Sequence, residues 1–318
     1  ALFIILPLLI FSGHLACNSA CITRILPVGS GPAGPVVSAE PFNASWYEGK
    51  VVLVGIGDSI TNGFGASEEH GYFSLLAHND DKFYPEMKGR DLNNVLPKLR
   101  SANYSQDYTI SQQHIDYQVS AIPKMSDDIF GIIVITSGGN DLIHDYGRSP
   151  AADGAMYGCT YEQALVWTEN LKQRQIQILE GVMAKFPGGC EIFFANIYDP
   201  TDGVGDPAKA GLPQWPDCMK VIAMANRNIS DLSDRYDNVH LVDIHSAFLG
   251  HGIHCKDFWR DNYQKDDPNF WYYLNLEDPN PRGYDAIRRL FLLKMAEVLP
   301  WRLKLLNGNL SMSEDVLH

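Results

Sequence analysis

The sequence is short of basic residues. Its 318 residues include 25 Lys and Arg against 38 Asp and Glu, which gives a formal net charge of −13. Binding to nucleic-acid phosphates depends on clustered Lys and Arg, so this balance argues against nucleic acid as a partner. With 45% apolar and 20% charged residues and no internal repeat, the chain is predicted to be globular.

An apolar run long enough to span a bilayer is also missing. The run Ala1–Phe11 is continuous but too short to span comfortably, and it contains Pro7. Such a run is typical of the core of a secretory signal, and the small residues Ala16 and Ala20 offer cleavage points. We therefore expect a secreted, periplasmic or cell-envelope protein whose mature domain does not insert stably into a membrane.

The N-terminal segment leaves two alternatives open, a lipid anchor at Cys17 and a retained membrane anchor. A stretch rich in Gly, Pro and Ser follows it, and the last residues are polar and aperiodic. The chain is thus divided into a leader (1–20), a linker (21–45), one domain (46–305) and a flexible tail (306–318).

Cysteine pairs of the kind that hold zinc are absent. Beyond the leader the cysteines are Cys159, Cys190, Cys218 and Cys255, and no two have CxxC spacing. In an exported domain, four cysteines allow three pairings into two disulfides, and sequence does not choose among them. Buried free thiols are the alternative.

Short apolar runs alternate with segments of helical spacing. The runs lack polar alternation, as in strands buried on both faces. They are Lys50–Ile56, Tyr108–Ser111, Gly131–Thr136, Glu191–Ile197 and Val239–Ile244, and the helical segments are Tyr161–Phe186, Pro216–Tyr236 and Gly283–Leu299. Such alternation implies right-handed crossovers and a parallel sheet. We predict one three-layer α/β domain that binds ligands beyond the carboxyl ends of its strands.

Two polar motifs follow predicted strands. Ser59, in Gly-Asp-Ser-Ile, follows the first run, where a hydroxyl at the open edge of the sheet is well placed as a nucleophile. Asn140, in Gly-Gly-Asn-Asp, follows the run that ends at Thr136, and its amide can donate to an oxyanion. The alternatives are a helix cap and a turn-forming Asn.

Together these motifs resemble the SGNH or GDSL family of hydrolases. The segment Asp278–Tyr284, ahead of the last helix, adds to a resemblance that covers most of Val51–Leu299. The resemblance implies an α/β/α sandwich with a five-stranded parallel sheet and hydrolysis of esters, often acetyl or acyl groups on lipids or carbohydrates. It implies Ser59 as nucleophile, with Asn140 and the Ser59 N–H as oxyanion donors. We expect no organic cofactor and no metal.

Two family positions hold other residues. The oxyanion glycine expected after the second strand would fall in residues 110–114, which have none, so we expect the N–H of Ser111 or Gln112 to substitute. The family's Asp-x-x-His-Pro block has Asn275 and Asp278 at the Asp and His positions. A carboxylate, with an ordinary pKa near 3.9 against about 6.5 for imidazole, is a poorer proton acceptor. A simple exchange is therefore expected to damage catalysis.

A loop after the last predicted strand offers a replacement imidazole. His251 and His254 lie there in Gly-His-Gly-Ile-His-Cys. We predict a rebuilt triad in which Ser59 attacks, His254 or His251 accepts its proton, and Asp278 orients the ring. Structural histidines and a metal site that includes both rings are the alternatives.

Further residues are expected around this site. Those predicted to line the substrate are Asp58, Gly139, Asp141 and His144. The acidic stretch 199–206 fits a calcium loop or, alternatively, a turn built on Asp side chains. Aromatic residues in Phe258–Tyr273 fit contacts with sugar rings or acyl chains, or packing of a long insertion.

The sequence thus predicts an exported serine esterase that hydrolyses an acyl ester, acetyl included. Its partner is expected to be a small-molecule, glycan or lipid ester. A non-catalytic protein of the same fold that binds a glycan or acyl ligand is the alternative.

Overall fold

The structure is a computed structural model that describes residues 26–67 and 69–306. The predicted leader, with Cys17, lies outside these residues, as does almost all of the predicted tail. Among the described residues, no helix combines the length and the apolarity needed to cross a membrane.

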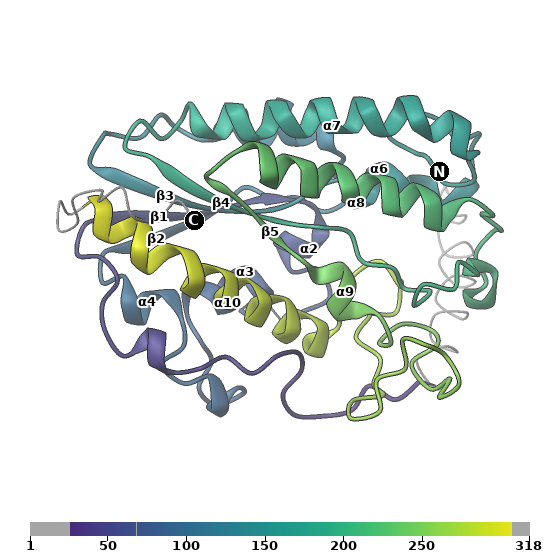
Figure 1. Cartoon of the computed structure of the whole chain (residues 1–318), viewed down its shortest axis with the longest axis horizontal. Helices are drawn as coiled ribbons and strands as arrows, with labels where there is room; N and C mark the ends of the chain where they lie inside the picture. Colours follow the sequence, from purple (N-terminus) through teal and green to yellow (C-terminus); the bar gives the residue numbers. More distant parts are fainter. Residues whose placement is uncertain (1–25, 68, 307–318) are drawn as a thin grey trace, which may run out of the picture.

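Five parallel strands form one sheet in the order β2-β1-β3-β4-β5 (Figure 1). The strands are β1 (Lys50–Gly57), β2 (Leu99–Asn103), β3 (Ile129–Thr136), β4 (Cys190–Ala195) and β5 (Val239–Val242). The order reverses between β1 and β3, and in open sheets of this kind ligands bind beyond the carboxyl ends of the strands at such a point.

Helices cover both faces of the sheet, with α7 and α8 on one side and α3, α4 and α10 on the other (Figure 1). The α-helices are α2 (Ser59–Asn62), α3 (Tyr72–Ala77), α4 (Leu92–Val95), α5 (Ser111–Gln113), α6 (Gly139–Ile143), α7 (Tyr161–Met183), α8 (Cys218–Arg235), α9 (Ile244–Phe248) and α10 (Pro281–Leu306). Shorter or irregular helices are η1 (Glu40–Phe42), η2 (Pro85–Met87), η3 (His114–Val119), η4 (His144–Gly147) and η5 (Pro207–Ala210). The predicted three-layer α/β sandwich is confirmed.

The central strands are apolar throughout because both faces of the sheet are buried. In β1, Leu53 packs in the cluster that includes α10, whereas Val54 packs in the cluster that includes α7 and α8. Ile132 and Ile133 of β3 alternate between the same two clusters. This two-sided burial explains why continuous apolar runs predicted these strands correctly.

The second strand was predicted at the wrong place. It is Leu99–Asn103, and Tyr108–Ser111 instead forms the turn that leads into α5. β2 lies at the edge of the sheet and is largely exposed, with a polar sequence. An edge strand with little buried surface carries no continuous apolar run, so the apolar pattern could not reveal it.

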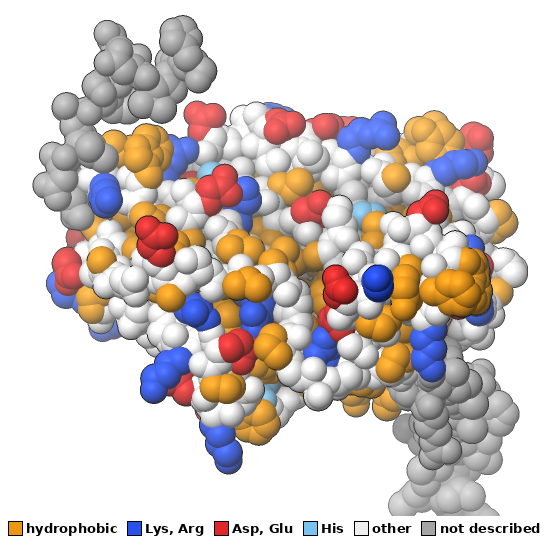
Figure 2. All heavy atoms as spheres, turned by 60° about the horizontal axis from the view of Figure 1, so that its bottom comes forward, with side chains coloured by type: hydrophobic (Ala, Val, Ile, Leu, Met, Phe, Trp, Pro, Cys, Tyr) orange, Lys and Arg blue, Asp and Glu red, His pale blue; other side chains and the backbone are white. Residues whose placement is uncertain are grey.

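The segment rich in Gly, Pro and Ser packs against the domain. The Arg282 guanidinium donates to the carbonyl oxygen of Ser30 at 2.8 Å, and the Ala33 N–H donates to Asp285 at 3.0 Å. This segment thus covers the start of α10. On the side of the molecule that Figure 2 shows, acidic and basic side chains are interspersed.

The four described cysteines are free and buried. Of the two possibilities that the sequence left open, two disulfides or buried free thiols, the structure thus has the second. Burial raises the pKa of each thiol to about 11 or 12, so all four are protonated at neutral pH. They are Cys159, Cys190, Cys218 and Cys255.

Candidate active site

Ser59 is the first residue of α2 and lies directly beyond β1. The chain turns there through Gly57, whose φ is 145° and where a Cβ would lie 2.4 Å from the Thr136 carbonyl oxygen. Asp58 caps α2, because its Oδ1 accepts hydrogen bonds from the Ile60 N–H at 3.2 Å and from the Thr136 hydroxyl at 2.9 Å. Ser59 is therefore held at the carboxyl edge of the sheet.

Asn140 reaches the same edge from β3. Gly138, with φ of 113°, allows the turn into α6, and the Asn140 amide then donates to the Thr109 carbonyl oxygen at 3.0 Å. That bond fixes the side chain and uses one of the two amide hydrogens, so the other can serve an oxyanion. Asn140 and Ser59 line one cavity, so the structure brings these two predicted residues together.

Ser111 belongs to a separate buried cluster. Its N–H donates to Asp141 Oδ2 at 2.9 Å and its hydroxyl donates to Asp141 Oδ1 at 2.5 Å. Arg174 of α7 donates to the Ser111 hydroxyl oxygen at 2.7 Å and to Asp141 at 3.3 Å. The N–H predicted to serve an oxyanion is thus engaged by a carboxylate, and Asp141 joins α5 to α7 instead of lining the cavity.

The loop after β2 keeps a left-handed turn without a glycine. Tyr108 has φ of 64°, a conformation for which Gly is usual. Beside it, the Thr109 hydroxyl donates to the Gly57 carbonyl oxygen at 3.1 Å, which fixes the loop over the end of β1. The sequence carried no signal for this turn.

Asp278 lies beside Ser59, on the loop that precedes α10, and is only 2% exposed. Burial raises the pKa of Asp278 to about 6. Interactions with the Ser59 hydroxyl and the Asn275 amide lower this pKa, and the Asp107 carboxylate raises it.

The two oxygens of Asp278 have different surroundings. Oδ2 accepts a hydrogen bond from the Asn275 amide at 2.6 Å. Oδ1 is buried and makes no hydrogen bond of ordinary geometry with any described residue. The Ser59 hydroxyl therefore approaches the carboxyl more loosely than the Asn275 amide does, as catalytic pairs often do without substrate.

Ser59, Asp278 and Asn275 form a series in which each side chain interacts with the next. Asp278 and Asn275 occupy the positions at which the family has His and Asp. A carboxyl whose pKa is about 6 is nearly as basic as an ordinary imidazole at about 6.5. Burial therefore offsets much of the loss of basicity that was expected from the exchange of His for Asp.

Two more carboxyls lie in the cavity wall next to Asp278. Burial, with a smaller contribution from the Asp278 carboxylate, raises the pKa of Asp58 to about 7. Burial also raises the pKa of Glu277 to about 7. The Tyr198 hydroxyl donates to the Glu277 carbonyl oxygen, which fixes the backbone next to Asp278. Such close carboxyls do not all ionise independently near neutral pH.

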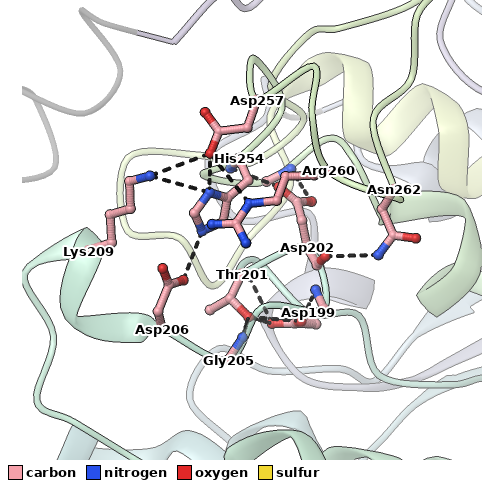
Figure 3. A network of polar contacts seen from close by, with 12 residues as sticks. Asp199, Thr201, Asp202, Gly205, Asp206, Lys209, His254, Asp257, Arg260 and Asn262 are labelled. Carbon is pink, nitrogen blue, oxygen red and sulfur yellow. Dashed lines mark hydrogen bonds and ion pairs between the residues drawn. The ribbon is translucent and has the colours of Figure 1, made fainter.

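His254 lies in a different polar network (Figure 3). Its Nδ1 is 2.6 Å from Asp257 Oδ2 and its Nε2 is 2.8 Å from Asp206 Oδ1, and the side chain is fully buried. Lys209 approaches the same Asp257 oxygen at 3.5 Å. Both ring nitrogens are thus engaged by carboxylates of this network, so these contacts favour a structural role.

His251 also has partners of its own. Its ring stacks on that of Trp271 with the centroids 3.4 Å apart, and its Nδ1 is 2.9 Å from the Asn269 carbonyl oxygen. Neither His251 nor His254 lines the cavity at Ser59. The role of proton acceptor stays a prediction for both rings, and their contacts do not support it.

The acidic stretch after β4 holds loops together. Asp202 accepts hydrogen bonds from the N–H groups of Gly250, Gly252 and His254 at 2.7–2.8 Å, and burial raises its pKa to about 6. Asp199 accepts from Thr201 and Gly203 within its own turn. Of the two interpretations of residues 199–206, these hydrogen bonds are those expected of a turn built on Asp side chains and not of a calcium loop.

The remaining predicted residues divide between the cavity and its surroundings. Asp58 and Gly139 line the cavity, whereas His144 is half-exposed and lies 3.7 Å from Asp145. In the aromatic segment, Phe270, Trp271 and Tyr272 are buried against the body, and Phe258 and Trp259 are exposed. Packing therefore accounts for the first three of these aromatic residues.

The fold and the site together define an α/β/α sandwich with a serine after the first strand and an asparagine after the third. Residues 56–286 match the model of the GDSL-like Lipase/Acylhydrolase family, and the chain belongs to this family. Members of the family are ester hydrolases, and membership supports that class of enzyme here. No protein with a curated description matches the sequence.

Solved structures with similar folds include three lipolytic proteins. The lipase Lip_vut3 from a goat rumen metagenome is 16% identical, with a TM-score of 0.49 over 79% of this chain and 100% of its own. An extracellular lipase from Streptomyces rimosus is 14% identical, with a TM-score of 0.48 over 77% and 99%. Phospholipase A1 from Streptomyces albidoflavus NA297 is 18% identical, with a TM-score of 0.44 over 77% and 98%. Similarity this distant carries no information on the substrate.

Proposed function

We propose that the protein is a serine ester hydrolase in which Asp278 accepts the proton of Ser59. The observation that carries this proposal is the series Ser59, Asp278 and Asn275, with the buried carboxyl beside the hydroxyl and the amide behind it. No other described titratable side chain has a contact with Ser59 that could take this role as directly. The predicted export of the chain stays part of the proposal and rests on the leader sequence.

The proposed reaction begins with attack of Ser59 Oγ on the ester carbonyl carbon, while its proton passes to Asp278. The Asn140 amide and the Ser59 N–H donate to the oxyanion that forms. Asp278 then returns the proton to the leaving alkoxide, and an acyl-enzyme remains. Water attacks this ester, again with Asp278 as base, and releases the acid.

Asn275 would act on this step through Asp278. Its amide donates to Oδ2, which holds the carboxyl in one orientation and stabilises its charge. Its own Oδ1 accepts from the Asp278 N–H at 3.2 Å, so backbone and side chain are held together. Asn275 is therefore proposed as a positioning residue.

The test combines a fluorophosphonate probe with hydrolysis of p-nitrophenyl esters. We expect the wild type to be labelled at Ser59 and Ser59→Ala to be neither labelled nor active. Asp278→Asn is expected to lower kcat/KM by about 10²–10⁴, the range typical of general base catalysis. Asp116→Asn, an exposed carboxylate on η3, is the matched control and should retain activity.

A non-catalytic binding protein is the second candidate. It is favoured by the replacement of the family's His and Asp with Asp278 and Asn275. The wild type would then show neither labelling nor hydrolysis although its cooperative unfolding shows that it is folded. That result would reject the proposed hydrolase activity and favour the binding protein.

A further inference from the structure

An apolar cavity of about 100 Å³ opens beside Ser59. Its polar groups include Ser59, Asn140 and Glu277, which belong to or adjoin the site described above. Elsewhere its wall is mainly hydrocarbon and aromatic ring, with Leu142, Ile197, Leu212, Trp215, Ile222 and Ile253 among the residues that form it.

The wall is built from elements that the catalytic series does not use. Leu142, Trp215 and Ile222 belong to a third apolar cluster, separate from the clusters on the two faces of the sheet. This cluster joins α6, α7 and α8 to the segment between β4 and α8. Within that segment, η5 contributes Pro207 and Ala210 to the cavity wall.

Resting on the function proposed above, we propose that this cavity holds the acyl chain of the substrate and selects unbranched acyl groups of four to six carbons. An apolar cavity of about 150 Å³ takes up benzene, so one of about 100 Å³ suits a short alkyl chain of roughly this length. An acetyl group would leave most of the cavity unfilled. A longer chain would exceed the volume of the cavity.

The chemistry of the wall selects against charged acyl groups. Glu277 lies in the wall, and a second carboxylate brought in by a dicarboxylic half-ester would have no cation among the lining residues to pair with. Each methylene that enters an apolar site is worth about 0.8 kcal/mol, or about a fourfold gain in kcat/KM. Butanoyl esters should therefore exceed acetyl esters by roughly 15-fold, and the gain should stop near hexanoyl.

The kinetic test is a series of p-nitrophenyl esters from acetyl to dodecanoyl. Ala210→Leu would extend a side chain into the cavity from η5 and should lower the ratio of hexanoyl to acetyl kcat/KM at least tenfold. Ala208→Leu is the matched control, since Ala208 lies on the same helix but outside the wall, and its ratio should equal that of the wild type. Equal rates for acetyl and hexanoyl esters, or an unchanged ratio in Ala210→Leu, would overturn the proposal.

A binding test separates this proposal from the catalytic one. Ser59→Ala, titrated calorimetrically with hexanamide and acetamide, is expected to bind hexanamide at least tenfold more tightly, and Ala210→Leu in the same background should remove the difference. If this holds while the wild type hydrolyses no ester, the enzyme proposal fails and the alkyl site stands. If the wild type hydrolyses esters but the two amides bind equally, the alkyl site is rejected and the enzyme proposal stands.

Discussion

The Asn275 amide donates a 2.6 Å hydrogen bond to Asp278 Oδ2, and the Ser59 hydroxyl is the other side-chain neighbour that lowers the pKa of this carboxyl. Family members that use imidazole have a carboxylate at the position of Asn275, because a cationic ring needs an anion behind it. A carboxylate base needs a neutral donor instead. The two exchanges are thus chemically consistent with each other: position 278 still holds the proposed proton acceptor and position 275 its partner, but the acceptor is now an anion and its partner is neutral.

The first prediction concerns the pH dependence of ester hydrolysis. Asp278 must be ionised to accept a proton, so kcat/KM should rise as the pH increases through its pKa of about 6. The Asp107 carboxylate raises this pKa, so Asp107→Asn should shift the rising limb to lower pH. A pH–rate profile of each protein between pH 4 and 9 measures the shift.

Asp116→Asn serves as the control for this shift, because Asp116 is exposed and contributes nothing to the pKa of Asp278. Its rising limb should coincide with that of the wild type. A limb that stays in place in Asp107→Asn would show that another group accepts the proton.

The second prediction is that Asp278→Asn stabilises the fold at alkaline pH while it impairs activity. The pKa of Asp278 rises from 3.8 to about 6 on folding, so the folded state holds this proton more tightly than the unfolded state does. The corresponding stability is present below about pH 4 and is lost as the pH rises through about 6. At pH 8, Asp278→Asn should raise the free energy of unfolding by on the order of 1–3 kcal/mol.

Urea denaturation at pH 8 and at pH 4 checks this sign. At pH 4 the variant should gain little, because Asp278 is already protonated in the folded wild type. If Asp278→Asn is instead less stable than the wild type at pH 8, the ionised carboxylate stabilises the folded state. That result would contradict a raised pKa of Asp278.

The third prediction is that the usual family residues can be restored together. In Asp278→His with Asn275→Asp, an imidazole would lie beside Ser59 with a carboxylate behind it, as the general triad requires. We expect this double variant to be at least tenfold more active than Asp278→His alone, in which no anion supports the ring. Steady-state kinetics on both variants, with thermal unfolding to verify that they fold, decides the point. Equal activity of the two would show that position 275 does not act on the base.

Much of the fold was predictable because four of its five strands have apolar sequences, and the central three are buried on both faces. β1, β3, β4 and β5 all appear as apolar runs, and α7 and α8 show helical spacing within a few residues of their true ends. β2 was missed because this edge strand is largely exposed and polar, whereas the other edge strand, β5, has a buried valine at each end. The docking of Ser30 and Ala33 on α10 depends on contacts made about 250 residues apart in sequence, which local pattern does not encode.

At the site, sequence order singled out Ser59, Asn140 and Asp278 as candidates but could not predict the raised pKa of Asp278. The ordinary pKa of a carboxyl favours an imidazole as the proton acceptor, and the sequence offers two in the loop that contains His251 and His254. The pKa depends on burial, which only the folded structure provides. The left-handed turn at Tyr108 was likewise hidden, since no glycine marks it.

The last prediction tests the competing imidazole directly. His254→Gln removes a ring that lies between Asp206 and Asp257, and should lower the free energy of unfolding by on the order of 2–4 kcal/mol, because two carboxylates lose their shared buried hydrogen-bond partner. At a temperature where the variant is folded, kcat/KM for p-nitrophenyl butanoate should stay within about threefold of the wild type, and its rising limb should remain near pH 6. Asp257→Asn is the matched variant, because it weakens the same network but leaves the His254 ring in place. It should lower the free energy of unfolding by part of this amount and leave kcat/KM unchanged. If His254→Gln alone loses activity by 10² or more while folded, and Asp278→Asn does not, then the inserted loop supplies the base and the role given to Asp278 is wrong.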